Sequence, residues 1–395
     1  MDNNVQASTP VSLEDLTRQL VWPKLLQSVR LALRPSRLGT GFLVIVVLMG
    51  VGTLFDWARG PVSHTPTLLP RVAALPAEGA EPSFGLFEAT VRTVAQRGGW
   101  LIESVLAGEP AQAALHLRDL IVTLPTTLAS RYPFSAGLMA LATLALWAIG
   151  GGALCRMVAR EAIAGERPTL AEALGFVLPR WGRFFAAILG PALAIAVVAL
   201  FMAVGGLLLL RFPAMDIVGG LLYGLFLLGG ALLVFLAAGV ALGGALLIPA
   251  VAVDAQDAFD AIERAYSYTL SKPLRLVVYA IVLLVVGSAA FFVAREATRA
   301  TLDATRDAAF AWTGGREELA LGGQALAALD EPAPLPEDMG PTARIAASLV
   351  RLWEHALVAL LAGFALSLLA SAATFLYLGM RRLCDGEGFL EKRAL

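Results

Sequence analysis

Six long stretches of the sequence lack Asp, Glu, Lys, Arg and His, namely 38–55, 132–155, 184–210, 217–253, 276–294 and 356–380. An α-helix needs roughly 17–25 mostly apolar residues to cross a bilayer, so each stretch is long enough to span a membrane. Ionisable groups inside a membrane usually mark ion paths, proton relays or catalytic sites. Their absence predicts an integral membrane protein and argues against an ion-coupled or proton-coupled mechanism.

Cysteine and histidine are also scarce. The chain has two cysteines, Cys155 and Cys384, and three widely separated histidines, with no Cys-x-x-Cys or His-Glu-x-x-His pattern. These absences exclude a disulfide framework and argue against a zinc site. No Ser–His–Asp set, phosphate-binding glycine loop or carboxylate cluster stands out either. We therefore expect no metal, no cofactor, no catalytic residue and no enzymatic activity.

Apolar residues are abundant. They make up 58% of the chain and charged residues 15%, whereas soluble domains average about 45–50% and about 25%. The net charge of -1 argues against nucleic acid as a partner, because phosphate binding needs concentrated Lys and Arg. Arginine outnumbers lysine 27 to 3, which is typical of proteins from GC-rich bacterial genomes.

Basic residues are unevenly distributed between the predicted spans. If both termini are cytoplasmic, the shorter inner segments hold 17 of the 30 Lys and Arg, and cytoplasmic loops are the ones that collect these residues. The first apolar stretch follows a long tail with acidic residues, so it reads as a retained span and not as a signal peptide. We predict a multi-pass protein of the bacterial inner (cytoplasmic) membrane with cytoplasmic N- and C-termini.

Two amphipathic segments share one pattern, which points to an internal duplication. Thr169 and Glu172 form a capping arrangement before one apolar stripe, and Asp257 and Asp260 stand at the same places before another. Both stripes have the spacing of a helix with one buried face, and the match fixes a shift of 88 residues. We predict two parallel span–elbow–span units. The alternative is that two unrelated interfacial helices look alike.

The same shift accounts for the overlong stretch 217–253. As one helix it would be roughly 55 Å long at ~1.5 Å per residue, and two spans with a turn would barely fit. Its last part corresponds to residues 156–165, which lie outside the bilayer in the first unit. We therefore predict a single span that continues as an interfacial helix, with a bend near Gly243, Gly244 or Pro249.

The remaining segments are predicted to be interfacial or extracytoplasmic. Residues 12–36 form a basic amphipathic element with Pro23 as a kink. The outer loops should hold helices near 84–96, 110–129 and 316–329. The predicted organisation is an interfacial tail (1–37), a first span (38–55), an outer helical loop (56–131), the duplicated core (132–294, with units 132–210 and 217–294), a second outer loop (295–355), a sixth span (356–380) and a cytoplasmic tail (381–395).

Three sets of residues are candidates for functional roles. Small residues let membrane helices approach closely, within one chain or in a dimer, and the pairs Gly220/Gly224 and Gly239/Gly243 fit that pattern. The Gly190-Pro191 pair either kinks its span or breaks it and exposes carbonyl groups to a substrate. The arginines of the first elbow either contact lipid headgroups or only set the topology; they are Arg156, Arg160, Arg180 and Arg183.

Two stretches resemble a known group of proteins. The second elbow reads Asp-Ala-Phe-Asp-Ala-Ile-Glu-Arg-Ala-Tyr-Ser-Tyr from Asp257, and the end of the sixth span reads Tyr-Leu-Gly-Met-Arg-Arg-Leu-Cys-Asp-Gly-Glu from Tyr377. Both resemble uncharacterised bacterial polytopic membrane proteins related to the membrane domain attached to some glycerophosphodiester phosphodiesterases. The resemblance implies a helical membrane fold. It does not extend to a catalytic phosphodiesterase domain, so that activity is not implied.

The sequence therefore predicts an all-α protein with six transmembrane helices, interfacial elbow helices and a duplicated span–elbow–span unit. The leading functional hypothesis is a non-enzymatic membrane protein that organises lipid, a membrane-protein partner or a homo-oligomer. The alternative is a transporter or channel for a neutral or amphipathic solute, since parallel repeats occur in transporters. A lipid-modifying enzyme ranks third.

Overall fold

A computed structural model describes residues 25–63, 65, 67–69, 84–212, 215–254, 257–313, 316–327 and 340–385. Over these residues the protein is all-α, apart from one isolated bridge between Ser63 and Phe84. Six helical segments are long and apolar enough to cross a membrane, which confirms the predicted fold class. They are α4 (Pro35–Arg59), α8 (Pro133–Ala164), α9–α10 (Leu170–Leu209), α12 (Tyr223–Asp254), α14 (Pro273–Phe310) and α16 (Pro341–Asp385).

Shorter helices connect these six. In the first elbow, α9 (Leu170–Val177) and the 3-10 turn η2 (Leu178–Arg180) lead into α10 (Trp181–Leu209), and in the second elbow α13 (Ala258–Ser271) leads into α14. The others are α3 (Gln27–Ala32), α5 (Leu86–Leu106), α6 (Pro110–Arg118), the π-helical η1 (Asp119–Thr123), α7 (Leu124–Arg131), α11 (Met215–Leu221), η3 (Arg316–Leu319) and α15 (Gln324–Ala327).

Both predicted units have the order span, elbow, span, but their elbows are capped differently. In the first, the Thr169 side chain accepts the backbone N–H of Glu172 and the Glu172 carboxylate accepts that of Thr169, so the capping box is complete. In the second, Asp257 occupies the N-cap position without a side-chain cap. Its carboxylate lies 3.2 Å from Arg183 instead, so an ion pair between the units replaces the local cap.

Most of the long stretch 217–253 forms one span, as the repeat predicts, because α12 runs without interruption from Tyr223 to Asp254; its first residues belong to the short helix α11 (Met215–Leu221). Neither proline breaks its helix. Pro249 lies inside α12 and Pro191 lies inside α10 next to Gly190, so the break considered at Gly190-Pro191 is not found, whereas a bend or kink at either position stays a prediction. Packed neighbours keep both prolines in helical backbone, since both are buried. The predicted kink at Pro23 lies outside the described residues, as does most of the tail element 12–36.

The outer-loop helices also differ from prediction. The helix predicted to end near residue 96 continues to Leu106, and Arg97 on it pairs with Asp119 at 3.0 Å, which holds α5 against η1. The helix expected over 316–329 is split into η3 and α15. Gly322 between them has φ of 59°, a left-handed conformation that a continuous helix does not contain.

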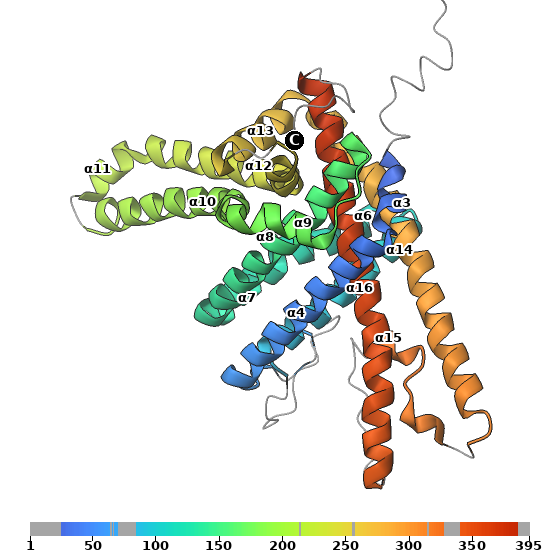
Figure 1. The fold of residues 1–395 in the computed structure, drawn as a ribbon. Helices are drawn as coiled ribbons and strands as arrows, with labels where there is room; N and C mark the ends of the chain where they lie inside the picture. The colour runs from blue at the N-terminus through green and yellow to red at the C-terminus, as the bar shows by residue number, and fades with distance from the viewer. Residues whose placement is uncertain are drawn as a thin grey trace, which may run out of the picture.

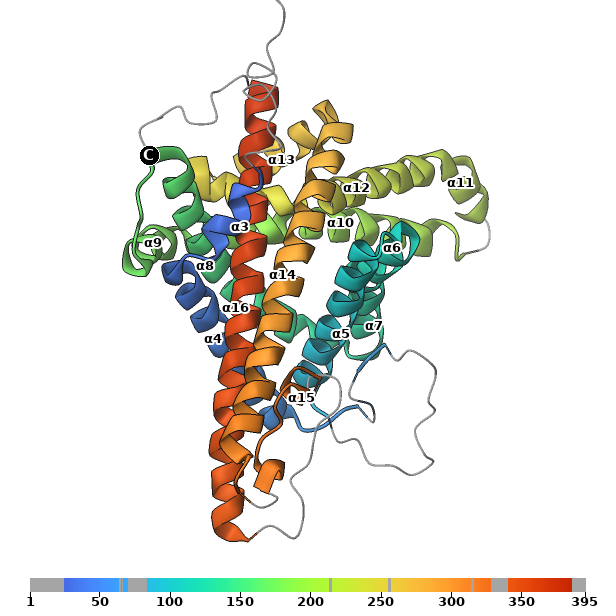
Figure 2. The ribbon, with the colours of Figure 1, turned by 90° about the vertical axis from the view of Figure 1, so that its right-hand side faces the viewer.

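The main buried core lies where one end of each central helix meets the others, and we call this region the hub. It includes residues with almost no exposure: Leu154, Val158, Phe184, Ala250, Val251, Ala265 and Phe375. Figures 1 and 2 show the helices converging there and diverging away from it. Because the hub lies at the ends of α8, α12 and α16, the core is off-centre and not at the middle of a bundle.

Away from the hub, the helices expose apolar side chains. The hairpin α10–α11–α12, which we call the arm, points to one side of the stem formed by α14 and α16 (Figures 1 and 2). Phe201 is 76% exposed on the arm and Val234 70%. Such apolar surface is stable only against lipid or another protein, as expected for helices that cross a membrane.

A close backbone contact joins the first and last spans. A Cβ placed on Gly41 of α4 would lie 2.2 Å from the carbonyl oxygen of Gly363 on α16, and one on Gly363 would lie 2.5 Å from the backbone nitrogen of Phe42. Only glycine permits this approach. Neither glycine stands out in the sequence, since the two residues lie more than 300 positions apart.

Candidate functional site

The hub contains a network of charged and phenolic side chains around Asp254. Asp254, the last residue of α12, accepts Arg264 of α13 at 2.9 Å and the Tyr377 hydroxyl of α16 on one carboxylate oxygen. Its other oxygen lies 3.2 Å from Arg381 of α16. One carboxylate thus fastens a span, an elbow and the end of the last span together. A carboxylate in this position is stable because all its partners are in place.

A second contact extends the network. The Tyr268 hydroxyl of α13 donates to Asp385 at the end of α16, and the Tyr268 and Tyr377 rings lie 5.9 Å apart. Burial raises the pKa of Tyr268, and the hydrogen bond to Asp385 acts in the same direction. The hydroxyl therefore stays protonated and donates its hydrogen bond throughout the physiological pH range.

These contacts unite the two stretches that carried the sequence resemblance. Arg264 and Tyr268 belong to the elbow stretch that begins at Asp257, while Tyr377, Arg381 and Asp385 belong to the stretch at the end of the last span. Neither stretch suggested pairing by itself, because their residues are more than 100 positions apart. The sequence feature that could have indicated this network is the high density of charged residues and tyrosines at the ends of two uncharged spans.

A second carboxylate network lies at the end of the first unit. Glu161 near the end of α8 is 3.1 Å from Arg34, pairs with Arg37 of α4 on its other oxygen, and lies 3.8 Å from Arg167. The Arg37 side chain is almost fully buried and also donates to the carbonyls of Leu31 and Met157. Glu161 therefore ties the first span, α4, to α8, whereas Asp254 ties the last span, α16, to α12 and α13.

The four arginines predicted to contact lipid headgroups have different environments. Arg156 is buried, donates to the carbonyl of Ala252 at 2.8 Å and lies 3.9 Å from the centre of the Phe176 ring. The structure therefore contradicts a surface role for Arg156, because α12 and Phe176 cover it. Arg160 pairs with Glu166, and Arg183 pairs with Asp257. Arg180 lies 4.5 Å from the Phe176 ring and is partly exposed.

The four predicted packing glycines fall into two groups. A Cβ on Gly239 would lie 2.0 Å from the Tyr266 ring and one on Gly243 2.7 Å from the Thr269 hydroxyl, so this pair seats α13 on α12. Gly220 and Gly224 have open space at the same position among the described residues. Packing by the second pair is therefore not observed among the residues that the structure describes. Gly219 is the closely packed glycine there, since a Cβ placed on it would lie 2.6 Å from the carbonyl oxygen of Leu209.

Carboxylates at the far ends of the helices have structural roles. Asp56 accepts the backbone N–H groups of Phe87 and Glu88 at the start of α5, and Glu354 accepts those of Leu321 and Gly322. His355, beside Glu354, contacts the Arg351 carbonyl of its own helix. Among the described residues, no group of three or more His, Cys, Asp or Glu could hold a metal ion.

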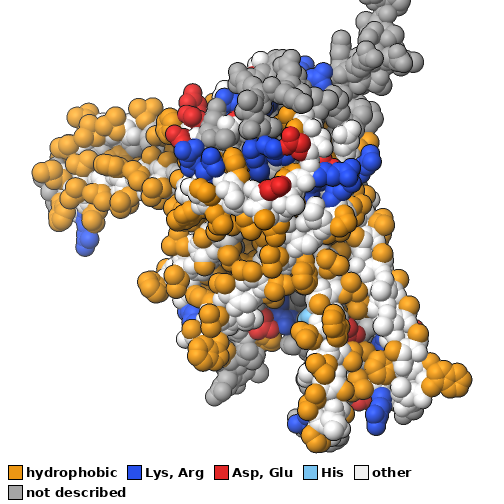
Figure 3. Space-filling model, in the orientation of Figure 1, with side chains coloured by type: hydrophobic (Ala, Val, Ile, Leu, Met, Phe, Trp, Pro, Cys, Tyr) orange, Lys and Arg blue, Asp and Glu red, His pale blue; other side chains and the backbone are white. Residues whose placement is uncertain are grey.

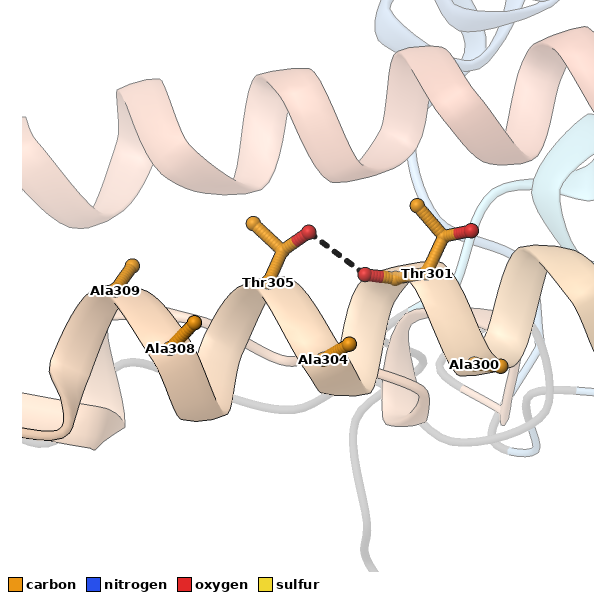
Figure 4. A pocket seen from close by; sticks show the side chains of 6 residues that line it. All are labelled: Ala300, Thr301, Ala304, Thr305, Ala308 and Ala309. Atoms are coloured by element: carbon orange, nitrogen blue, oxygen red, sulfur yellow. Dashed lines mark hydrogen bonds between the residues drawn. The ribbon is translucent and has the colours of Figure 1, made fainter.

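Two hollows are prominent on the surface. The first, about 790 Å³, is an open groove on the outer part of α14 lined by alanines and threonines that project from one face of the helix (Figure 4). The second, about 920 Å³, lies between α10 and α12 and is lined mainly by apolar residues such as Met202, Phe226 and Val234. Neither lining contains an ionisable acid–base pair, so neither hollow resembles a catalytic site.

The hub is therefore the region with the greatest concentration of specific interactions, and its carboxylates are occupied by arginine and tyrosine. Such an arrangement can fix helices in place and present cationic groups at its rim. Comparison with known proteins adds no relative: no family model, no curated protein and no solved structure matches the chain significantly.

Proposed function

We propose that this protein is a non-enzymatic membrane scaffold that organises lipid or a membrane partner around diverging apolar helices. The observation that carries the proposal is the off-centre core. Specific contacts are concentrated in the hub, while the helices that leave it expose leucine, valine and phenylalanine over most of their length.

The hub has the properties expected of a mechanical junction. Asp254 and Glu161 each bind arginines from a span outside the duplicated core, and the surrounding residues are closely packed. The spread of the helices leaves lateral surface for lipid acyl chains or for the helix of a partner. A scaffold needs this combination of a rigid centre and accessible sides.

The transporter alternative is less well supported. It requires a polar path between the two units, yet Val158 of α8 and Ala250 of α12, which belong to neighbouring helices, are fully buried in one apolar core. The groove between α10 and α12 is apolar and opens sideways, which suits an acyl chain better than a hydrated solute.

The location and relationship of the protein also belong to this proposal. The basic residues at the hub support an orientation in the bacterial inner membrane with the hub and both termini on the cytoplasmic side. A relationship to the group that includes the phosphodiesterase membrane domains is proposed from the two resembling stretches of sequence alone.

Spin-labelled phospholipids test the scaffold. In proteoliposomes the diverging helices should immobilise more lipid per protein than a compact six-helix bundle of equal size, and vesicles loaded with neutral solutes should leak no faster than protein-free vesicles. Saturable, solute-selective flux would contradict the scaffold and favour the transporter.

A further inference from the structure

The two elbow regions at the hub differ sharply in charge. Around the first elbow, the described residues include seven arginines and three glutamates, a formal surplus of four positive charges. Around the second elbow, five basic residues face five acidic ones. We call the first set the basic corner, and it consists of Arg34, Arg37, Arg156, Arg160, Arg167, Arg180 and Arg183 with Glu161, Glu166 and Glu172. The second set consists of Arg264, Lys272, Arg275, Arg381 and Arg382 with Asp254, Asp257, Asp260, Glu263 and Asp385.

The surplus is not required by the repeated fold. Five of the seven arginines belong to the first unit itself, and a shift of 88 residues places none of them on a basic residue of the second unit. The corresponding residues are Gly244, Ile248, Ala255, Tyr268 and Ser271. The second unit thus forms its span and elbow without these charges.

Partners within the chain satisfy the basic corner only in part. Arg34, Arg37 and Arg167 share the single carboxylate of Glu161, while Arg160 pairs with the exposed Glu166. Among the described residues, Arg156 and Arg180 form no ion pair; their guanidinium groups stack on Phe176 and donate to the Ala252 and Phe176 carbonyls. Their mutual repulsion, with that of Arg160, favours an additional anion.

The corner also adjoins an interfacial apolar surface. Trp181 and Leu178, which flank Arg180, are about half exposed, and the apolar helix α10 begins at Trp181. Figure 3 shows Lys and Arg side chains, with Asp and Glu among them, in a band across the upper part of this face, next to a broad apolar surface. Tryptophan next to basic residues is typical of the level at which lipid headgroups lie.

We propose that the basic corner binds a phosphate group, and that this group belongs to an anionic phospholipid whose acyl chains lie along α10. Arg167 supplies an exposed guanidinium group, and Arg160 and Arg180 supply partly exposed ones; the planar guanidinium group matches the geometry of phosphate oxygens. Stacking on Phe176 holds Arg180 in place before the ligand arrives. The inference rests on the proposed scaffold and names the lipid that it organises.

Native mass spectrometry of the full-length protein tests this site. The protein is titrated with phosphatidylglycerol, with phosphatidylcholine and with inorganic phosphate. The site variant R160Q/R167Q removes two charges from the basic corner, leaves Asp254 and its partners unchanged and leaves Glu161 its two closer partners, Arg34 and Arg37. The matched control K272Q/R275Q removes two charges from the second elbow.

Phosphatidylglycerol should bind the site variant about tenfold or more weakly than the wild type, and the control variant within about twofold of it, because two phosphate-binding charges are lost only in the former. Phosphatidylcholine should bind all three proteins equally weakly. Displacement of the lipid by millimolar inorganic phosphate would support the phosphate site and assign it to a soluble ligand. Equal weakening in both variants, or none in either, would overturn the proposal while leaving the flux and spin-label results on the scaffold unaffected.

Discussion

Asp254 and Glu161 are two carboxylates with equivalent roles at the hub. Asp254 lies at the end of α12 and Glu161 near the end of α8, and each binds an arginine from another span: Arg381 of α16 for Asp254, and Arg37 of α4 for Glu161. Removing one member of such a group leaves the other charges buried without a partner, which costs far more than the group contributes when intact.

Replacement of Asp254 by asparagine should therefore destabilise the protein strongly. The side chain keeps its shape, but Arg264 and Arg381 lose their shared counter-charge, and we expect a loss of about 3 kcal/mol. Unfolding by sodium dodecyl sulfate in mixed micelles measures the change. E263Q, on the exposed face of the same elbow, serves as the control and should change stability by less than about 0.5 kcal/mol. Equal stability of the two variants would show that Asp254 is not a junction.

The contact between Gly41 and Gly363 gives a second test at this scale. G41A places a methyl group against the α16 backbone and should cost about 1–3 kcal/mol, because neither helix can move without disturbing the hub. G39A lies two residues away on the same helix with no atom within 4 Å, so it should be neutral or slightly stabilising. The same unfolding assay compares them, and a neutral G41A would contradict the close approach of α4 to α16.

At the scale of helices, local patterns predicted most of the elements. The apolar stripes of 170–181 and 258–269 became elbow helices, since one-sided periodicity depends only on neighbouring residues. Single prolines left two outcomes open, a bend within a helix or a break. Pro191 and Pro249 do not end their helices, because the outcome there depends on packed neighbours that lie far away in the sequence.

The candidate site was predictable only in part. The sequence shows that charged residues gather at the ends of the spans, and it predicts that their arginines either set the topology or contact lipid headgroups. The sequence does not predict the hydrogen bond from Tyr377 to Asp254, because these residues lie on different helices. For the same reason it does not predict that Phe176 and Ala252 cover Arg156. Only the three-dimensional arrangement separates the buried arginines from the exposed ones.

The glycine pair Gly239/Gly243 on α12 and the pair Gly220/Gly224, which joins α11 to the start of α12, should respond differently to the same substitution. G239A introduces a methyl group into the Tyr266 ring and should displace α13, lowering stability by about 1–3 kcal/mol. G224A, in the pair that lies in open space, should have no such cost. Thermal unfolding in detergent measures both. A loss of stability confined to G224A would mean that Gly220 and Gly224 pack against a partner or a second copy, and that α13 does not pack on α12 through Gly239.

At the scale of the whole molecule, the arm and the stem differ in direction, and this difference bears on how the protein lies in a membrane. Helices that cross one flat bilayer tilt by at most about 40° from its normal. The arm and the α14–α16 stem point in widely different directions (Figures 1 and 2). We therefore expect the arm to change its direction relative to the stem when both cross one flat bilayer. Elbow α13 packs against the bases of both arm helices, with Gly190 facing Ile262 and Gly239 facing Tyr266. This base is where the arm would turn.

Pulsed electron spin resonance on paired labels should detect the reorientation. With C384S as background, labels at Leu221 near the arm tip and Trp353 on the stem should lie closer together in a flat lipid bilayer than in detergent micelles, which impose no common direction. Labels at Ala309 and Leu349, both on the stem, should keep their separation. An arm-to-stem distance that is the same in both environments would mean that the arm is rigidly fixed to the hub.

The two native cysteines allow the closed hub to be tested without altering its interior. Cys155 is 3% exposed among α8, α12 and α16, whereas Cys384 is partly exposed near the end of α16. In open membrane fragments, a membrane-impermeant maleimide should label Cys384 quickly and Cys155 only after denaturation. Labelling of Cys155 in the folded protein at a rate comparable to that of Cys384 would show that water enters the hub, and it would contradict the scaffold in favour of a transport path.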